Sequence, residues 1–467
     1  MERLGLSSLE NWLVSKNRKP LILRGARQVG KSTLVSLFAK AQNIDMIEVN
    51  LERYLYLDDI FKTLNVDKVL KELQAIAMKK LTKTSLLFLD EVQATPHALA
   101  CLRYFKEDFP EIPVIAAGSL LEFTLSDHSF SMPVGRVEYR HLGPMTFKEF
   151  LHAIYPGLLQ YLGEISLDNP LPDHAHLQLI EKQREYLFIG GMPEAVKVYQ
   201  ESGSFQDVQE VHRSICDTFL DDFAKYARKK ELILLQRTFR SIPRMIGMKV
   251  KYKNISVDDR AADVRNALEL LMKARICSGI FASSCSGLPL QSGINTKVFK
   301  PLFLDIGLVN HLMGIDWRTI STLSGKELLT EGSLAEQFIG QHLLSSPDMR
   351  KKPELNYWLR EQRSSNAEVD YVISHGNAII PIEVKSGKSG SLKSLQQFVY
   401  RKAPQITVRL DLNPPSIQKV QSKIRTKEGI QEINFNLMSL PLYAIEELNR
   451  MIESELLYRC SQMKCYQ

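Results

Sequence analysis

The sequence predicts an α/β protein built from alternating strands and helices, and three observations lead to that prediction. Residues 25–32 match the phosphate-binding pattern G-x-x-x-x-G-K-[ST] without a gap. A short apolar run, residues 86–89, ends in the acidic pair Asp90-Glu91. Apolar runs of strand length alternate with helix-type patterns after the first motif, as they do in βαβ units. The length of 467 residues allows about two to four domains.

The glycine-rich stretch predicts a nucleotide site because of its flanks. Residues 20–24 are expected to form a buried strand and residues 32–40 a helix, so backbone N–H groups and a helix N-terminus point at one anion. Lys31 would reach the β- and γ-phosphates, and the Ser32 hydroxyl would bind Mg²⁺. A chance match in an ordinary strand–helix turn is the alternative, and the two correct flanks weigh against it. The expected nucleotide-binding residues of this loop are Gly25, Gly30, Lys31, Ser32 and Thr33.

The acidic pair predicts hydrolysis in addition to binding. Asp90 and Glu91 follow a buried strand, and ligands of open α/β sheets bind at the carboxyl ends of the strands. Asp90 is expected to hold Mg²⁺ and Glu91 to orient or deprotonate the attacking water. An exposed acidic strand end is the alternative. Residues 45–50 and 112–119 are further expected strands, and Ser119 at the end of the second would sense the γ-phosphate from a neighbouring strand.

Residues 1 to about 160 resemble the P-loop AAA-type ATPases of bacteria and archaea that carry a C-terminal domain of unknown function. The similar pieces are RGARQVGKST at residues 24–33, LDEVQ at 89–93, AGSL at 117–120, VGR at 134–136 and LGPMTFKEFL at 142–151. GGMP at 190–193 and FLDIGL at 303–308 also fit, so the resemblance spans nearly the whole chain. It implies a Rossmann-like ATPase core in residues 1–160 with the P-loop strand central.

The same resemblance implies an arginine finger just before the fifth strand. Arg136 is the first candidate for this catalytic role and Arg140 the second. A finger that reaches the nucleotide of an adjacent subunit would need a homo-oligomer, and action within one chain is left open. The alternative is an ordinary surface arginine.

Residues 161–320 are expected to form a helical and winged-helix-like module. A helical pattern at 177–200 is interrupted at 190–193, where Gly-Gly and Pro turn the chain. From Lys225 to Lys253 there are ten Lys or Arg residues and one acid, Glu231. A helix at 258–273, with Asp258 as N-cap, precedes the β-rich residues 276–281 and 296–304. Helices followed by strands predict a winged helix-turn-helix, which the resemblance also implies.

A winged helix predicts contact with duplex DNA. The helix from about Arg260 would enter the major groove, and four basic residues would lie on phosphates: Arg244, Lys249, Lys251 and Lys253. The acids Asp258, Asp259 and Asp263 stand where base contacts would be made, so a module that serves only in packing is the alternative.

Residues 321–467 are expected to form a second α/β domain with a carboxylate site. A helix at 332–344 precedes strands at 355–360, 367–373 and 378–385. Twelve residues separate Asp370 from Glu383, and Lys385 lies two residues beyond Glu383. Strand alternation puts Glu383 and Lys385 on one face, and a hairpin would bring Asp370 beside them.

This spacing resembles the D-x(n)-E-x-K signature of the restriction-endonuclease-like superfamily. Asp370 and Glu383 offer hard oxygen ligands for Mg²⁺ or Mn²⁺, and Lys385 would help position or deprotonate the attacking water. Glu336 matches the additional acidic residue of that superfamily and completes the expected metal ligands. A solvated charged strand, or a retired nuclease fold kept as a binding surface, is the alternative.

Bulk composition adds few constraints. The net charge of +7 is mild, and the basic segment accounts for more than all of it. The six cysteines form no C-x-x-C pair and are expected to be reduced thiols. There is no signal peptide pattern and no apolar run of about 18 residues. We therefore expect a cytoplasmic protein without a membrane partner.

Together these features predict a protein that binds and hydrolyses ATP with Mg²⁺ and acts on nucleic acid, with DNA as the expected partner. A C-terminal metal-dependent, nuclease-like domain, using Mg²⁺ or Mn²⁺, would perform that action. The competing hypothesis is a nucleotide-gated signalling protein or scaffold that binds DNA or protein through an inactive nuclease fold.

Overall fold

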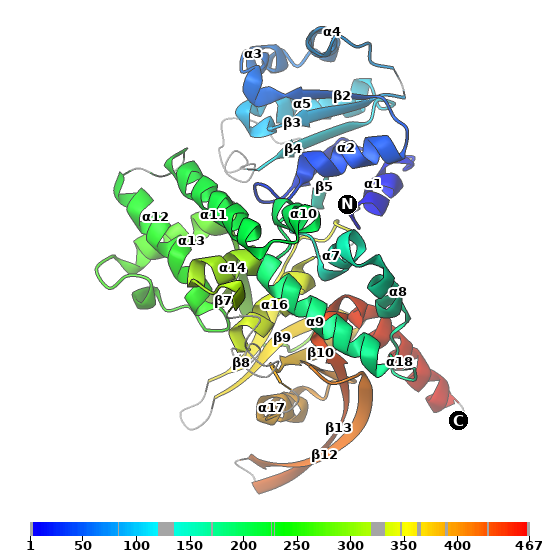
Figure 1. The fold of residues 1–467 in the computed structure, drawn as a ribbon, viewed down its shortest axis with the longest axis vertical. Coiled ribbons are helices and arrows are strands. Elements are labelled where there is room, and N and C mark those ends of the chain that lie inside the picture. The colour runs from blue at the N-terminus through cyan, green and yellow to red at the C-terminus, as the bar shows by residue number, and fades with distance from the viewer. Residues whose placement is uncertain are drawn as a thin grey trace.

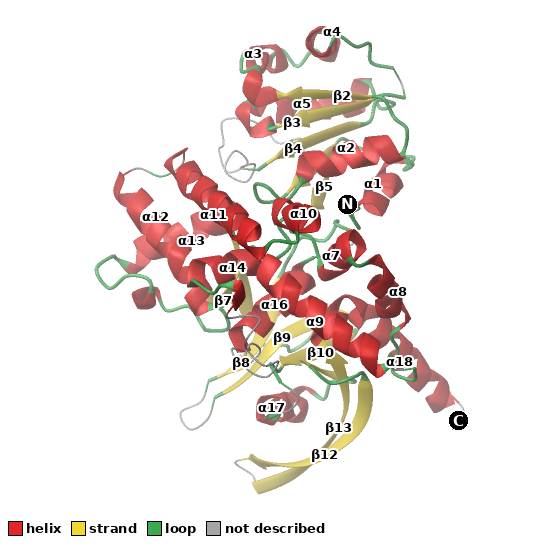
Figure 2. Cartoon of the chain, in the orientation of Figure 1, coloured by secondary structure: helices red, strands yellow, loops and turns green. Residues whose placement is uncertain are grey.

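The computed structural model shows two sheets, one at each end of the molecule, with helices between and beside them (Figures 1 and 2). It describes residues 3–82, 84–119, 135–169, 171–225, 227, 229–318, 332–345, 348–361, 366–387, 391–426 and 429–464. The quoted residues Leu120 and Val134 lie outside these ranges. Within them, no helix is long and apolar enough to cross a bilayer, and Cys101, Cys216, Cys277 and Cys285 are free and buried, as expected of reduced thiols.

The first sheet has five parallel strands. Four were predicted with their bounds, whereas the fifth was expected only as the strand after the arginine-finger candidates, and Arg140 lies inside it. The five strands are β1 (Leu21–Arg24), β2 (Met46–Asn50), β3 (Leu86–Asp90), β4 (Val114–Gly118) and β5 (Glu138–His141). Their order is β2-β3-β4-β1-β5, with every neighbouring pair parallel. The P-loop strand β1 therefore lies inside the sheet, and the carboxyl ends of β1, β3 and β4 share one edge.

Helices cover both faces of this sheet, so the inner strands β1, β3 and β4 are almost entirely buried. The helices are α1 (Leu6–Leu13), α2 (Lys31–Ala41), α3 (Leu57–Lys62), α4 (Val66–Ala77) and α5 (Pro96–Asp108). Successive residues of β1 point to opposite faces. Leu23 packs in the core that contains Phe38 of α2, whereas Ile22 packs in the core that contains Phe105 of α5.

The middle of the chain is helical (Figure 2). Its helices are α7 (Phe147–Ile154), α8 (Pro156–Glu164), α9 (Asp173–Ile189), α10 (Pro193–Ser202), α11 (Phe205–Asp222), α12 (Lys229–Ser241), α13 (Ala261–Lys273) and α14 (Ile306–Met313). The predicted break holds: Gly190 ends α9 at φ +73°, and Pro193 is the first residue of α10.

The predicted N-cap of α13 was wrong. The helix begins at Ala261, three residues after Asp258, and Arg260 stands at the N-cap position without a side-chain cap. The carboxylate of Asp259 instead accepts hydrogen bonds from Ser256 Oγ (2.7 Å) and Arg237 Nη1 (3.1 Å). These bonds hold residues 256–259 in a turn, and the helix starts only after it.

The second sheet has eight strands, which come from both the middle and the C-terminal parts of the chain. Its strands are β6 (Cys277–Ser283), β7 (Ile294–Phe303), β8 (Leu355–Arg360), β9 (Ala367–His375), β10 (Ala378–Val384), β11 (Thr407–Asp411), β12 (Ser416–Thr426) and β13 (Gly429–Pro441). Their order is β12-β13-β11-β10-β9-β8-β6-β7. The expected wing hairpin β6–β7 thus extends the C-terminal sheet through parallel pairing of β6 with β8. The predicted boundary at 320/321 lies outside the described residues, and the sheet is continuous across it.

Three helices accompany this sheet: α16 (Gly332–Leu344), α17 (Lys393–Lys402) and α18 (Leu448–Lys464). Residues Leu442–Glu447 form a 3₁₀ segment directly before α18. The long hairpin of β12 and β13 was not predicted. Ile424 is the one buried residue of β12, so the strand has no apolar run from which it could be recognised.

Candidate functional site

Two glycines shape the P-loop. Gly30 adopts the left-handed conformation at φ +88° and precedes the first residue of α2, a conformation that favours glycine. A β-carbon at Gly25 would lie 2.3 Å from the Leu142 carbonyl oxygen. The loop therefore needs glycine at both predicted positions.

The predicted phosphate and magnesium ligands meet at the edge of the sheet. Lys31 Nζ donates to the carbonyl oxygens of Gly25 (3.1 Å) and Ala26 (2.8 Å). Ser32 Oγ donates to Asp90 Oδ2 at 2.7 Å, although 57 residues separate them in the chain. Thr33 is exposed in the first turn of α2.

Burial sets the electrostatics of this site. It lowers the pKa of Lys31 to about 8, against the attraction of Glu91 and Asp90. Burial also raises the pKa of Asp90, with the charge of Glu91 adding to the shift and the Ser32 hydrogen bond opposing it. A hydroxyl and a carboxylate oxygen in contact, beside a buried lysine, are the donor set that a Mg²⁺-bound nucleotide requires.

Glu91 is held in an unusual backbone conformation. Its φ of 51° and ψ of 44° are left-handed, which is uncommon for a residue other than glycine. Gln93 Nε2 donates to Glu91 Oε2, and a β-carbon at Gly118 would lie 2.3 Å from Gln93 Oε1. Gln93 therefore spans from Glu91 to the end of β4, where Ser119 is buried. Nothing in the local sequence identified Gln93 as a positioning residue.

The two arginine-finger candidates differ in exposure. The Arg136 side chain is 49% exposed and pairs with Glu107 at 3.0 Å. Arg140 is buried and donates to Ser8 Oγ at 3.0 Å and to the Tyr139 carbonyl oxygen. Of the two, Arg136 is the one whose side chain can reach beyond its own domain.

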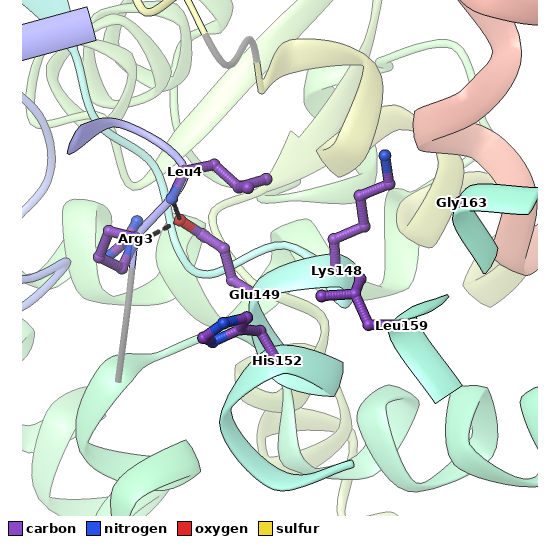
Figure 3. A pocket seen from close by; sticks show the side chains of 7 residues that line it. All are labelled: Arg3, Leu4, Lys148, Glu149, His152, Leu159 and Gly163. Atoms are coloured by element: carbon purple, nitrogen blue, oxygen red, sulfur yellow. Dashed lines mark hydrogen bonds and ion pairs between the residues drawn. The ribbon is translucent and has the colours of Figure 1, made fainter. Parts of the chain in front are cut away.

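Residues far from the motif also hold the P-loop. Arg3 Nη1 donates to the Val29 carbonyl oxygen (2.9 Å), and its Nε pairs with Glu149 of α7. Figure 3 shows this pair beside a cavity of about 310 Å³. Arg27 of the loop donates to both carboxylate oxygens of Asp222 on α11, at 2.8 and 2.7 Å. The loop is thus tied to the N-terminal segment and to the middle helices.

The C-terminal motif residues come together as predicted. In the antiparallel pair β9–β10, Ile382 lies opposite Tyr371, so Glu383 and Asp370 follow at the next step. Lys385 Nζ donates to Glu383 Oε1 at 2.6 Å, which fits their common face. Asp370 Oδ2 accepts from the backbone N–H of Val384 at 2.8 Å.

Two further residues belong to this carboxylate site and were not predicted. Lys300 on β7 is fully buried, 3.3 Å from Glu336 Oε2 on α16, and also pairs with Glu368 on β9. Burial alone would lower the pKa of Lys300, but the charges of Glu336, Asp370 and Glu368 outweigh it and raise that pKa. The lysine stands 36 residues before Glu336 and 68 before Glu368 in the sequence, so no local spacing pattern could have revealed it.

Burial and mutual repulsion shift the carboxylates. Burial, followed by the charge of Asp370, raises the pKa of Glu336 to about 7 and that of Glu383 to about 8. Lys300 opposes the shift at Glu336, and Lys385 opposes it at Glu383. The charges therefore lie close enough to act on one another.

The fit of a divalent cation to these residues rests on one atom. Glu383 Oε2 is buried and has no hydrogen-bond partner, as a vacant ligand oxygen would be. Within the described ranges, however, no three acids, histidines or cysteines are grouped so that they could hold a metal ion. Glu336 and Glu383 each bond a lysine instead. The predicted ligand set of Asp370, Glu383 and Glu336 is thus not assembled around a metal position in this structure.

Three family models match separate parts of the chain. Residues 17–151 match an AAA domain, residues 180–319 a domain of unknown function (DUF8612), and residues 331–429 another domain of unknown function (DUF4143). No curated protein matches the chain.

The solved structures that match the chain include a RuvB motor and a DnaA protein. The Thermotoga maritima RuvB Holliday junction branch migration motor is 17% identical, with a TM-score of 0.28 over 59% of this chain and 86% of its own. AMPPCP-bound DnaA from Aquifex aeolicus is 16% identical, with a TM-score of 0.25 over 58% and 87%. Likeness at this level carries no information about function. The AAA-domain match and the geometry of the loop define residues 17–151 as an AAA-type P-loop ATPase domain. An AAA-type domain implies a nucleotide and, as a rule, Mg²⁺.

Proposed function

We propose that this protein hydrolyses ATP at the P-loop and uses the reaction to control its C-terminal domain. The observation that carries the proposal is the 2.7 Å contact between Ser32 Oγ and Asp90 Oδ2. It joins the two halves of a magnesium site that lie far apart in sequence. Bound Mg²⁺ would neutralise charge on the phosphates.

Each residue of the ATP site has a separate proposed role. Lys31 and the loop N–H groups bind the β- and γ-phosphates, while Ser32 and Asp90 face the metal position. Glu91 orients the attacking water and takes its proton, and Gln93 holds Glu91 in place. Ser119, buried directly after β4, would contact the γ-phosphate.

Two substitutions test the proposal. Lys31→Ala should abolish ATP turnover, measured as phosphate release, and should weaken nucleotide binding. Glu91→Gln should abolish turnover but leave binding intact, because the amide keeps the shape and loses the base. Unchanged ATP turnover in both variants would contradict the proposal. Lys71→Ala, an exposed lysine on α4, is the matched control.

Arg136 is proposed to complete the site of a neighbouring subunit in a homo-oligomer. Its side chain is half exposed and its ion pair with Glu107 is solvated. Mixing Lys31→Ala chains with Arg136→Ala chains should restore some turnover, because each supplies what the other lacks. If Arg136→Ala has normal turnover alone, the residue is an ordinary surface arginine.

A second candidate function is cation-dependent hydrolysis of a nucleic-acid phosphodiester at the carboxylate site. The buried, unpartnered Oε2 of Glu383 beside Asp370 and Lys385 favours it. In that reaction water adds to phosphorus, one P–O ester bond breaks, and the leaving oxygen takes a proton. Single-stranded and duplex DNA and RNA, each with Mg²⁺ or Mn²⁺, should be cut by wild type and not by Asp370→Ala. Identical behaviour of the two proteins would leave the competing function, a nucleotide-gated scaffold that binds without cutting.

A further inference from the structure

The basic residues of the middle module lie against the C-terminal carboxylate site. We call residues 244–253 the basic loop. A β-carbon at Gly247, where φ is +77°, would lie 3.0 Å from Glu336 Oε1. The backbone N–H of Val250 donates to the Phe299 carbonyl oxygen at 2.9 Å, next to Lys300 on β7. The basic loop therefore runs along β7 and over the carboxylate of α16.

The loop presents cations to solvent at this place. Arg244, Lys251 and Lys253 are exposed, and the loop contains no acidic residue. Lys249 has a different task, because its Nζ pairs with Glu361 Oε1 at 2.8 Å, just beyond β8. It ties the loop to the sheet and leaves the three exposed cations as the free charge of the surface.

The carboxylate site opens to solvent through its outer acids. The Glu368 side chain is 33% exposed and Asp370 is partly exposed, whereas Glu383 and Lys300 are buried. Two buried polar atoms here lack a partner: Glu383 Oε2, and the hydroxyl of Tyr357 on β8, whose ring centroid lies 5.1 Å from Lys300 Nζ. Buried polar atoms are nearly always hydrogen-bonded, so a water, an ion or a ligand group would satisfy these two atoms.

A group of carboxylates repels phosphate, so a polyanion can approach it only where neighbouring cations offset that repulsion. The basic loop supplies this charge within six residues of Gly247, which lies against Glu336. We infer that the basic loop and the carboxylate site form one composite binding site, in which Arg244, Lys251 and Lys253 hold the phosphate backbone of a nucleic-acid strand across the carboxylates. The inference rests on the proposed action on nucleic acid and states where the strand lies.

Binding in the absence of divalent cations tests the surface without cleavage. Labelled DNA and RNA oligonucleotides of one sequence are titrated with the full chain in EDTA, and fluorescence anisotropy gives Kd at several salt concentrations. The variant Arg244→Ala/Lys251→Ala/Lys253→Ala should bind about tenfold more weakly or worse, with a salt slope reduced by about three. The matched control is Lys62→Ala/Lys68→Ala/Lys71→Ala, which removes three exposed charges from α3 and α4 and should bind like wild type.

Equal affinity of the basic-loop variant and wild type would overturn the inference, as would an equal loss in the control. If the variant loses affinity for DNA and RNA alike, the loop contacts the phosphate backbone that both share. If it loses affinity for only one of them, that nucleic acid is the one the site binds. Polyglutamate is added as a competitor. If it displaces the oligonucleotide at equal charge concentration, the surface recognises acidic polymers in general and the inference fails.

Crosslinking tests the position of the strand. Met248 is 51% exposed and follows Gly247, whereas Met78 is 91% exposed at the end of α4. p-Benzoylphenylalanine in place of Met248 should crosslink to bound oligonucleotide, and the same residue in place of Met78 should not. Crosslinking at neither position, or equally at both, while binding persists would contradict the composite site.

One variant separates this inference from the cleavage proposal. Asp370→Ala should bind and crosslink the oligonucleotide at least as well as wild type, because it removes a negative charge from the site. Binding that depends on the basic loop, without any metal-dependent cut, would leave the composite site intact and reject only the nuclease function.

Discussion

The P-loop site and the C-terminal carboxylate site both place acids beside a lysine, yet they balance charge in opposite ways. Lys31 donates to two backbone carbonyl oxygens, and its pKa falls to about 8. Lys300 bonds two carboxylates, and its pKa rises. The first lysine can exchange its carbonyl partners for phosphate oxygens, whereas the second already neutralises the acids around it.

The difference teaches that similar residues support different kinds of chemistry. A site whose cation is held by neutral groups is ready for an anionic ligand. A site whose cations are paired with its own carboxylates must lose or rearrange a pair before those oxygens can bind metal. The geometry of the P-loop is accordingly suited to binding ATP. Metal binding at the C-terminal site would first require one of its lysine–carboxylate pairs to open.

The largest expected effects come from variants that disable one of the two sites and leave the other intact. Glu91→Gln should lower ATP turnover by about 100-fold or more, since a general base contributes about that much. It should leave oligonucleotide binding in EDTA unchanged. Asp370→Ala should leave ATP turnover unchanged in the absence of nucleic acid. Loss of turnover in Asp370→Ala would contradict the division into two sites and indicate one coupled active site.

The next prediction concerns how much the buried charge of Lys300 contributes to the stability of the protein. Lys300→Met leaves Glu336 and Glu368 without their common cation and should destabilise the protein by about 3 kcal/mol. Lys385→Met is the comparison, because Lys385 is 22% exposed and pairs with one acid, and it should cost about 1 kcal/mol. Urea unfolding measures both. Equal losses would show that the two lysines do not differ in the way proposed.

Acid should weaken the hydrogen bond by which His342 links α16 to α7. This residue lies on α16, the helix of Glu336, and its Nε2 accepts the N–H of Phe147 in α7, so Nδ1 carries the proton and donates to Phe338 O. Burial lowers the pKa of His342 from 6.5 to about 4. Stability is therefore present above about pH 6.5 and is lost as the pH falls toward 4, by on the order of 2–3 kcal/mol.

His342→Gln isolates that contribution, because glutamine does not titrate. The variant should lose less stability than wild type between about pH 7 and pH 4.5 in urea unfolding. Comparison with wild type is needed since Asp305 acts in the opposite sense: burial raises its pKa to about 6, so its contribution to stability is lost as the pH rises through that value. Parallel pH profiles of the two proteins would reject the role of His342.

The smallest effect concerns the tie between the P-loop and the middle helices. Arg27→Ala removes a two-oxygen contact with Asp222, but Asp222 keeps its ion pair with Lys225 at 2.9 Å. The cost should be about 1 kcal/mol of stability. If the tie also positions the loop, KM for ATP should rise more than kcat falls. Asp222→Asn should reproduce that change, and an unchanged KM in both variants would limit the pair to a structural role.

Local patterns were enough to predict much of the first domain. The inner strands β1, β3 and β4 are short, mostly apolar runs. Ser32 of the predicted motif contacts Asp90, as the two motifs together predicted. The hairpin that joins Asp370 to Glu383 was predicted for the same reason, because strand alternation and a short turn are local properties. The half-exposed strand β12 lacks such a pattern and was missed.

The sequence by itself predicted which groups would bind a phosphate, and it located the strands that carry them. Only the tertiary structure decided what balances their charge: Lys300 from β7 among the C-terminal acids, Arg3 and Gln93 around the P-loop, and the basic loop over Glu336. These contacts join elements that are distant in the chain. Burial and long-range packing select them, and neither leaves a periodic pattern in the sequence from which a partner can be identified.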